Sequence, residues 1–277
     1  MGLAVAQALA SRGGWHLHLL DLNASRGEQA AKDVAGATFH QTNVTDYDSL
    51  ASVFQKVWDT GGRLDFVFAN AGIVERFNFY DTHPPDKPPP PPDQTVIDIN
   101  LKSVINTAWL AQHYFRQSTA SENKNLVMTA SVGGLYRCQV SPSYCAAKHG
   151  VVGLMRSIAN NFYKLDGVRV NAICPGTVRT NLLDQKAWST FSDDVFVPIE
   201  KIASTVLMLI DGYDDGGMSV GDSKPLQQVN GEGKGEKLNG KAVELSGDRH
   251  YYRDQIGYCD PHMEMCMKAT EREKYEE

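Results

Sequence analysis

Short apolar runs and helix-like segments alternate along the whole chain. The apolar runs, several of them apolar enough for burial on both faces, predict strands at 16–21, 37–44, 63–72, 125–131, 168–176 and 241–247. The segments between them have the apolar spacing of helices and predict helices at 2–12, 25–35, 46–59, 95–117, 143–165 and 199–210. This alternation predicts an α/β fold, a doubly wound parallel sheet of Rossmann type in a single domain.

Two segments interrupt the alternation. Residues 83–93, HPPDKPPPPPD, cannot form a helix or a central strand, because proline lacks a backbone donor and fixes its own backbone angle. They predict a stiff surface loop, either a tolerated insertion or a docking site for a proline-binding domain. Residues 211–240 are rich in glycine and charge and predict a mobile loop. The domain is expected to span 1–250, followed by a tail at 251–277.

The composition narrows the classes of partner. The chain has 277 residues, 42% hydrophobic and 22% charged, which suits one globular core. Its net charge of -6, without a clustered basic face, argues against a nucleic-acid partner. Five cysteines lack paired metal-site spacing, so we expect free thiols in a reducing compartment and no bound metal. No apolar stretch reaches the length of a membrane span and no basic residue precedes the N-terminal apolar run, so we expect a cytoplasmic protein.

Small and acidic residues stand where the predicted strands end, which is where a doubly wound sheet binds its ligand. Asp21 ends the first strand, at the position where such folds use a carboxylate to hold the two hydroxyls of an adenosine ribose. Asn70, Ala71 and Gly72 close the third strand, and the last two lack bulk, so backbone could approach a flat ligand closely there. Each of these features is common by chance when taken alone.

The stretch SVGGLYRCQVSPSYCAAKHG holds the main candidates for catalysis. Tyr144 and Lys148 are four residues apart near the start of a predicted helix, so their side chains project from one face. A phenol is a poor base near neutral pH, but a nearby ammonium would lower the pKa of Tyr144, which could then exchange a proton with an alcohol or a carbonyl. With 11 tyrosines in the chain this spacing alone has little specificity, but Ser131, Pro175 and Gly176 at neighbouring strand ends increase it.

Five motifs follow one another along the chain: NAG at 70–72, Asn100 in DINLKS, Ser131 in TASVGG, YCAAK at 144–148 and NAICPGTVRT at 171–180. In this order they resemble the short-chain dehydrogenase/reductase superfamily in its shorter form, from residue 2 to about residue 250. SYCAAKHGVVGLMRS and GVRVNAICPG are most similar to 15-hydroxyprostaglandin dehydrogenase-like enzymes, and the polyproline loop resembles fungal relatives in secondary metabolism. The resemblance implies an oxidoreductase with a Rossmann-type fold.

The same resemblance implies four catalytic residues. Tyr144 would be the acid/base, and Lys148 would lower its pKa and bind the nicotinamide ribose. Ser131 would orient and polarise the reacting oxygen, and Asn100 would hold the water through which protons reach Lys148. The hydride itself would pass between a substrate carbon and the nicotinamide ring, so the protein would supply orientation and proton handling.

The dinucleotide contacts are also implied by the resemblance. Asp21 would hold the adenosine ribose and favour NAD over NADP, because its charge would repel a 2′-phosphate. Asn43, where the family usually has Asp, and the adjacent Val44 would lie at the adenine, so we expect adenine affinity to be modified rather than lost. The remaining contacts implied for the cofactor are Gly2, Asn70, Ala71, Gly72, Tyr144, Lys148, Pro175, Gly176, Val178 and Thr180.

Two features depart from the family pattern. The family begins with a strand and a TGxxxGxG turn, of which MGLAVAQAL retains only Gly2, so we expect the first strand to be absent from this chain. Either the protein starts further upstream or the chain is a real truncation without full activity, and the intact later motifs favour the first explanation. The second departure is Ser141, where the prostaglandin branch has a glutamine that places the substrate. A prostaglandin substrate is therefore not assumed.

Together these features predict an NAD-dependent oxidoreductase that interconverts a secondary alcohol and a ketone, with Tyr144 as the acid/base. The alternatives are an NADP-dependent carbonyl reductase and a catalytically silent dinucleotide-binding or interaction protein. The small residues of the Tyr144 helix and the apolar 95–117 helix, which form the usual interface in the family, predict a homodimer or homotetramer.

The substrate pocket is expected to be shaped by residues 181–200 and by the tail after Arg249. The apolar residues of the first segment suggest a bulky apolar alcohol or ketone, although plain core packing explains them about as well; these residues are Leu182, Leu183, Trp188 and Phe191.

Overall fold

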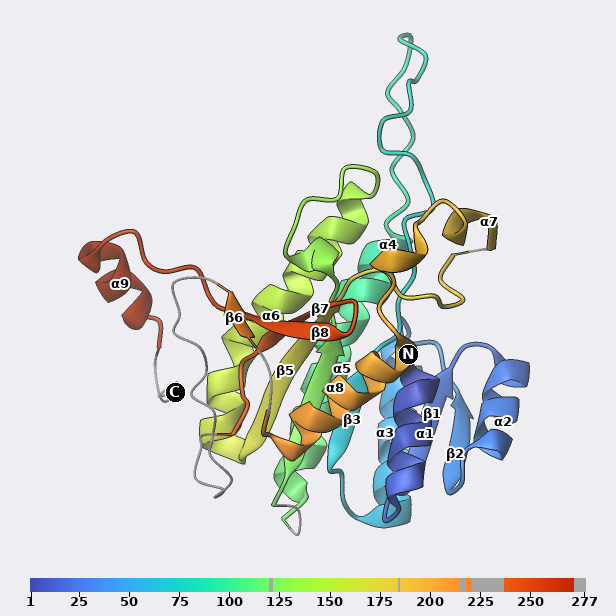
Figure 1. Cartoon of the computed structure of the whole chain (residues 1–277), viewed down its shortest axis with the longest axis vertical. Coiled ribbons are helices and arrows are strands. Elements are labelled where there is room, and N and C mark those ends of the chain that lie inside the picture. Colours follow the sequence, from blue (N-terminus) through green and yellow to red (C-terminus); the bar gives the residue numbers. More distant parts are fainter. Residues whose placement is uncertain (120–121, 184, 215–217, 221–236, 272–277) are drawn as a thin grey trace.

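The computed structural model describes residues 1–119, 122–183, 185–214, 218–220 and 237–271 (Figure 1). The strands are β1 Leu17–Asp21, β2 Ala37–Gln41, β3 Phe66–Ala69, β4 Lys124–Thr129, β5 Val168–Pro175, β6 Met218–Val220, β7 Ala242–Ser246 and β8 Arg249–Arg253. The helices are α1 Gly2–Arg12, α2 Ala24–Asp33, α3 Tyr47–Gly61, α4 Thr95–Ile97, α5 Ser103–Gln117, α6 Pro142–Asp166, α7 Gln185–Trp188, α8 Ile199–Asp211 and α9 Pro261–Lys268.

Helices cover both faces of the central strands, as the alternating pattern predicts (Figure 1). In β4, Leu126 and Met128 belong to the core formed with α3, α5 and α6, whereas Val127 between them belongs to the core formed with α1 and α8. All three side chains are fully buried. Because successive residues of a strand point to opposite faces, a continuous apolar run is what a strand covered on both sides requires. The predicted doubly wound α/β fold is therefore confirmed.

The strands form two separate sheets, β1-β2 and β3-β4-β5-β7-β8-β6. The pairs from β3 to β7 and the β1-β2 pair are parallel, but β7 and β8 pair in antiparallel fashion, with Ser246 opposite Arg249. The two residues between them begin with Gly247 at φ 57°, the positive angle that suits the first position of a tight hairpin turn. This hairpin departs from the purely parallel expectation. It also places the predicted domain boundary at 250 inside β8.

The division of the sheet falls between β1 and β3. In the doubly wound order the first strand, which the sequence predicts to be absent, would lie at this place in the sheet. β1 and β3 each pair on one side only among the described residues. The first three residues of β3 and the middle three of β1 are only partly buried, whereas all eight residues of β5 are buried. Side chains rather than backbone hydrogen bonds connect the two parts, and the rings of Trp15 and Phe66 meet edge to face at 6.3 Å between centroids.

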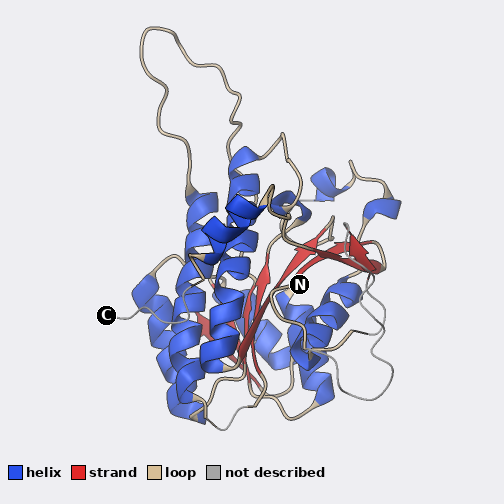
Figure 2. Cartoon of the chain, turned by 90° about the vertical axis from the view of Figure 1, so that its left-hand side faces the viewer, coloured by secondary structure: helices blue, strands red, loops and turns tan. Residues whose placement is uncertain are grey.

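The two interrupting segments differ in how far the structure tests them. Residues 83–93 are exposed throughout and extend as a loop well beyond the helices (Figure 1, Figure 2), as predicted. Much of the 211–240 loop, namely 215–217 and 221–236, lies outside the described residues. Within the rest of it, Met218–Val220 form a strand that pairs with β8, so this segment is not a loop throughout.

Candidate active site

Most of the predicted catalytic side chains lie just beyond the carboxyl end of β4 and on the helices beside it. Ser131 follows β4, which ends at Thr129, and Tyr144 and Lys148 lie in the first turns of α6. Asn100 comes from a π-helical turn, Asp98–Lys102, that joins α4 to α5. The sequence predicts one uninterrupted helix there, and the wider turn is the local difference that places Asn100 in the site.

The ammonium of Lys148 is buried at the centre of this group. Its side chain is 3% exposed, and Nζ donates a hydrogen bond of 2.8 Å to the backbone carbonyl of Thr129. The Thr129 hydroxyl in turn donates to Oδ1 of Asn70 at 3.0 Å. Burial lowers the pKa of Lys148 to about 8, because desolvation disfavours the charged form.

The side chain of Asn100 fixes the segment that follows the NAG motif. Its Oδ1 accepts from the backbone N–H of Ile73 and its Nδ2 donates to the carbonyl of Ile73, both at 2.8 Å. A β-carbon on Gly72 would lie 3.3 Å from this Oδ1 and 3.7 Å from Nζ of Lys148. Asn100, which is predicted to hold a water, thus binds the backbone of Ile73 in this structure. This contact positions the exposed backbone of Gly72 next to the buried Lys148 ammonium.

Tyr144 lies close to Ser131, because a β-carbon on Gly133 would lie 3.3 Å from Cε1 of the tyrosine ring and 3.6 Å from Oγ of Ser131. Burial raises the pKa of Tyr144, while the interaction with the Ser131 side chain acts in the opposite direction. The Lys148 ammonium is 5.7 Å from the centre of the tyrosine ring and makes its hydrogen bond to Thr129 instead. The expectation that Lys148 lowers the pKa of Tyr144 is therefore not met in this arrangement, because the cost of burying a phenolate is the larger effect.

The residues predicted for the adenosine end lie at the ends of β1 and β2. Asp21 is exposed, and its Oδ1 accepts from the backbone N–H of Asn23 at 2.8 Å. Asn43 is also exposed, but its Oδ1 already accepts from both the N–H and the hydroxyl of Thr45. The oxygen that the sequence reasoning offered to adenine is thus engaged in a local turn, while Val44 packs at the edge of the core.

The residues predicted for the nicotinamide end follow β5 or approach the NAG motif. A β-carbon on Gly176 would lie 3.1 Å from the Leu245 carbonyl, and one on Gly2 would lie 3.1 Å from Nδ2 of Asn70. Both positions are therefore tight, and a side chain at either would force its neighbour to shift by a few tenths of an ångström. Val178 is buried, and Thr180 offers its carbonyl to the indole N–H of Trp188 at 2.9 Å.

Of the four apolar residues predicted for the substrate pocket, Trp188 and Phe191 pack against one another with ring centroids 6.0 Å apart. Each also contacts the ring of Phe196. The three aromatic residues thus pack on one another in a partly exposed cluster, with Phe191 41% exposed, which favours the simpler interpretation of packing, and Leu182 and Leu183 are partly buried.

Sequence reasoning missed three contributors to this site. Thr129 holds Lys148 and Asn70, Ile73 receives the Asn100 clamp, and a carboxylate oxygen of Glu75 accepts from the backbone N–H of Tyr144 at 2.9 Å. Ile73 and the Thr129 carbonyl that holds Lys148 act through backbone groups, which leave no mark in the residue type, and the Thr129 hydroxyl reaches Asn70 across 59 residues of chain. Glu75 acts across 69 residues of chain, so no local spacing indicates it.

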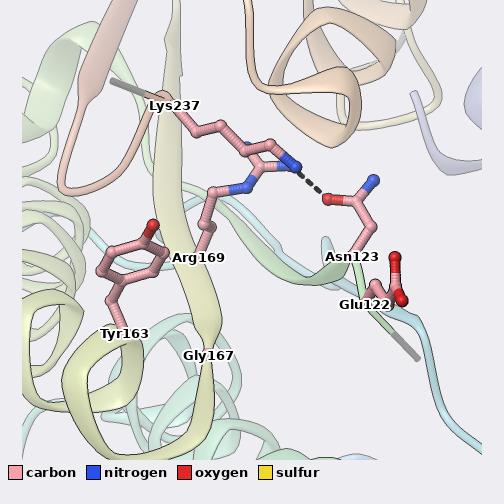
Figure 3. Close-up of a pocket in the computed structure, with 6 residues that line it drawn as sticks. All are labelled: Glu122, Asn123, Tyr163, Gly167, Arg169 and Lys237. Carbon is pink, nitrogen blue, oxygen red and sulfur yellow. Dashed lines mark hydrogen bonds between the residues drawn. The ribbon is translucent and has the colours of Figure 1, made fainter. Parts of the chain in front are cut away.

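A pocket lies around Arg169, near the start of β5 and away from the candidate catalytic residues, and the contacts of Arg169 show that this residue has a structural role there (Figure 3). The guanidinium of Arg169 donates to the carbonyls of Leu209 and Ile210, the last turn of α8, and to Oδ1 of Asn123 at 2.8 Å. A cation at the carboxyl end of a helix satisfies carbonyls that have no partner within the helix. The residues that line this pocket are Glu122, Asn123, Tyr163, Gly167, Arg169 and Lys237.

Comparison with known proteins decides the family. Residues 1–189 match the family described as short chain dehydrogenase. The chain belongs to this family. It is therefore an oxidoreductase of the short-chain dehydrogenase type, whose members bind a nicotinamide dinucleotide. Gly72 fits such a ligand here, because its bare, exposed backbone lies beside the buried Lys148 and Asn100.

Individual relatives agree with this assignment. The chain is 48% identical over 280 residues to the short-chain dehydrogenase/reductase prx7 of Penicillium rubens, covering 98% of this chain and 96% of that protein. It is 36% identical over 192 residues to human 15-hydroxyprostaglandin dehydrogenase [NAD(+)], covering 66% of each. The solved structure of ElxO with NADP bound covers 88% of this chain and 92% of its own, with a TM-score of 0.66 and 19% identity, and so supports the fold.

The described residues also show whether this part of the chain has a membrane-spanning helix or a metal site. Within the described ranges, no helix combines the length and the apolar character that crossing a membrane requires. The same part of the chain holds no group of three or more His, Cys, Asp or Glu side chains placed to bind a metal ion.

Replacing Lys148 by Met tests the cost of burying its ammonium. In the folded chain the pKa of Lys148 is about 8, below its ordinary value of 10.5, so the unfolded chain binds more protons between these pH values and stability rises with pH there. The cost is fully present below pH 8, and Lys148→Met removes it. We expect the midpoint of thermal unfolding of Lys148→Met, relative to the parent, to be higher at about pH 7 than at about pH 9.5. An equal difference at both pH values would contradict the burial argument.

Proposed function

We propose that the chain is an NAD-dependent dehydrogenase that interconverts a secondary alcohol and a ketone. The observation that carries this proposal is that Ser131, Tyr144 and Lys148 lie together. A β-carbon on Gly133 would lie 3.3 Å from the Tyr144 ring and 3.6 Å from the Ser131 hydroxyl oxygen, and the Lys148 ammonium is 5.7 Å from the centre of the same ring. A hydroxyl and a phenol this close together can both hold one substrate oxygen. The bound dinucleotide supplies the hydride chemistry, and the residues of the chain orient the substrate and move the proton.

Tyr144 is the proposed acid/base in both directions. Because burial raises its pKa, Tyr144 is a neutral phenol at neutral pH and can donate its proton to a carbonyl oxygen that is becoming an alkoxide. In alcohol oxidation the phenolate takes the hydroxyl proton, and the nearby Ser131 side chain favours that charged form. Lys148 is the proposed partner of the nicotinamide ribose, because its ammonium lies beneath the exposed backbone of Gly72.

NAD is the proposed cofactor in preference to NADP. Asp21 is exposed at the end of β1, where its charge would accept hydrogen bonds from ribose hydroxyls and repel a 2′-phosphate. Similarity to 15-hydroxyprostaglandin dehydrogenase [NAD(+)] supports this preference. ElxO, whose structure has NADP bound, is only 19% identical, so its cofactor carries little weight against the carboxylate of Asp21.

The proposed substrate is a small molecule, a bulky apolar alcohol or ketone, held near the segment after β5. That segment carries Leu182 and Leu183, both partly buried. A role in secondary metabolism is proposed from the resemblance of the polyproline loop to fungal relatives; the chain is also similar over nearly its whole length to a short-chain dehydrogenase/reductase of Penicillium rubens. A prostaglandin is not proposed, because the short side chain of Ser141 stands where the prostaglandin branch has a glutamine that places the substrate.

Self-association through α5 and α6 is proposed from exposed apolar surface on these helices. Trp109 is 67% exposed and Ile105 is 43% exposed, one turn apart on α5. On α6, a β-carbon at Gly153 would meet nothing within 4 Å, so that face can approach another helix closely. Large exposed apolar side chains beside a smooth helix face favour an interface between copies of the chain.

A reducing compartment such as the cytosol is the proposed location. The five cysteines are all free, and they range from the buried Cys174 to the exposed Cys259 and Cys266. Free exposed thiols suit a compartment in which disulfides do not persist.

Substituting Tyr144 by Phe tests the proposed chemistry. Phe keeps the ring and its packing but removes the proton that the reaction needs. We expect turnover of secondary alcohols with NAD to fall by about a thousandfold or more, in line with the contribution of a general acid/base, while NAD affinity changes little. NAD titration by fluorescence and steady-state kinetics measure the two effects. Turnover within about tenfold of the parent would rule out the assigned role.

Cofactor choice is tested at Asp21. We expect kcat/KM with NAD to exceed that with NADP by at least about tenfold, which corresponds to ~1.4 kcal/mol, and Asp21→Ala to reduce this ratio. Asp48→Ala, which removes an exposed carboxylate from the first turn of α3, is the control and should leave the ratio unchanged. Equal efficiency of the parent with both cofactors would count against the NAD assignment.

The proposed interface is tested at Trp109. Because Trp109→Glu places a charge within the apolar surface of α5, we expect sedimentation at micromolar concentration to shift from a dimer or tetramer to the monomer. Tyr80, 64% exposed in the loop after β3, provides the control, and Tyr80→Glu should not change the assembly. A parent chain that already sediments as a monomer would refute the interface.

A further inference from the structure

A carboxylate from a distant segment caps the helix that carries Tyr144. Oε2 of Glu75 accepts a hydrogen bond of 2.9 Å from the backbone N–H of Tyr144. Ser141, which directly precedes α6 and is a residue type that often caps helices, makes no such hydrogen bond with its side chain. Glu75 therefore performs the capping function from across the fold.

The other backbone groups at this end of the helix explain why the Tyr144 N–H needs a partner. The first N–H groups of a helix have no acceptor within the helix. Pro142 has no N–H to satisfy, and the N–H of Cys145 bonds to the carbonyl of Ser141. The amide of the proposed acid/base is thus held by a side chain that can be changed without altering α6 itself.

The second carboxylate oxygen of Glu75 also indicates that the side chain is directed at the helix. Oε1 is buried and has no hydrogen-bond partner among the described residues. A buried carboxylate is costly unless its charge is compensated. The compensation visible here is the amino end of α6, a 25-residue helix whose dipole favours a negative charge at that end. The charge and the acceptor of Glu75 are therefore both directed at the turn that carries Tyr144.

We propose that Glu75 is a positioning residue for Tyr144, which holds the first turn of α6 so that the phenol meets Ser131. The proposal rests on the proposed function, because the position of the phenol matters only if it transfers a proton. It also connects two parts of the site. Glu75 lies three residues after Gly72, and Asn100 clamps the intervening Ile73, so one short segment is fixed both to the π-helical turn and to the catalytic helix.

Three substitutions of Glu75 distinguish the effect of its side-chain length from the effect of its charge. Glu75→Gln keeps the length and an acceptor oxygen but loses the charge. Glu75→Asp keeps the charge but is one methylene shorter, so its oxygen falls short of the Tyr144 N–H. Glu75→Leu removes both. Asp46→Ala is the matched control, because Asp46 caps α3 in the same way, accepting from the N–H of Ser49 at 3.1 Å, and does not contact Tyr144.

The first measurement is steady-state kinetics with NAD and a secondary alcohol, at a temperature below the unfolding midpoint of every variant. We expect kcat to fall about tenfold or more in Glu75→Leu and Glu75→Asp, with KM for NAD changed less than about twofold, and to stay within about threefold of the parent in Glu75→Gln. Asp46→Ala should lower the unfolding midpoint and leave kcat unchanged. A Glu75→Leu enzyme with kcat within about twofold of the parent, or a Glu75→Gln enzyme as slow as Glu75→Leu, would overturn the proposal.

The second measurement does not depend on turnover. Amide hydrogen exchange at Tyr144 should accelerate in Glu75→Asp and Glu75→Leu but not in Glu75→Gln or Asp46→Ala, because only the first two lose the acceptor. Unchanged exchange in Glu75→Leu would overturn the positioning role. If the parent itself shows no turnover with any secondary alcohol, the proposed function fails, and the exchange data still decide whether Glu75 holds the catalytic turn.

Discussion

The burial of one ammonium group, that of Lys148, determines how the parts of this site are arranged. A charge without solvent needs an acceptor, and the carbonyl of Thr129 provides it at the last residue of β4. That contact ties α6 to the end of a central strand. The same ammonium is near Gly72 and Asn100, so the loop after β3 and the π-helical turn must also pack around it. The end of β4, the loop after β3 and the π-helical turn are thus all positioned against the Lys148 ammonium, which belongs to α6.

Burial also sets the order in which the two proton-carrying groups titrate. It raises the pKa of Tyr144 and lowers that of Lys148 to about 8, so in this arrangement the lysine loses its proton before the tyrosine. The spacing of the two residues on one helix face predicts proximity correctly but gives the wrong sign for the pKa of the phenol. Spacing carries no information about desolvation, and here desolvation outweighs an ammonium 5.7 Å from the ring.

The elements of the fold could be predicted largely from sequence, because each has a local signal. The continuous apolar run of β4 indicates burial on both faces, and the Tyr144 motif follows the helix start at Pro142. The antiparallel β8 is not predicted, because the short segment RHYYR lies across the predicted boundary between the domain and the tail. Contacts between distant segments were missed for a different reason. The acceptor for the Tyr144 N–H comes from Glu75, and only the folded chain brings that carboxylate to the helix.

The division of the sheet has a consequence for how cofactor recognition and catalysis are joined. The side chains predicted to be catalytic lie on the six-stranded sheet and its helices, whereas Asp21 and Asn43, predicted to hold the adenosine, lie at the ends of β1 and β2. Among the described residues no backbone ladder links the two sheets, so their relative position depends on side-chain packing, such as that of Trp15 against Phe66 and of α1 against both. Apolar packing is less directional than a hydrogen-bonded ladder. A dinucleotide that touches both Asp21 and Lys148 would span this junction, and its binding energy would then contribute to holding the adenosine end at a fixed distance from the reacting end.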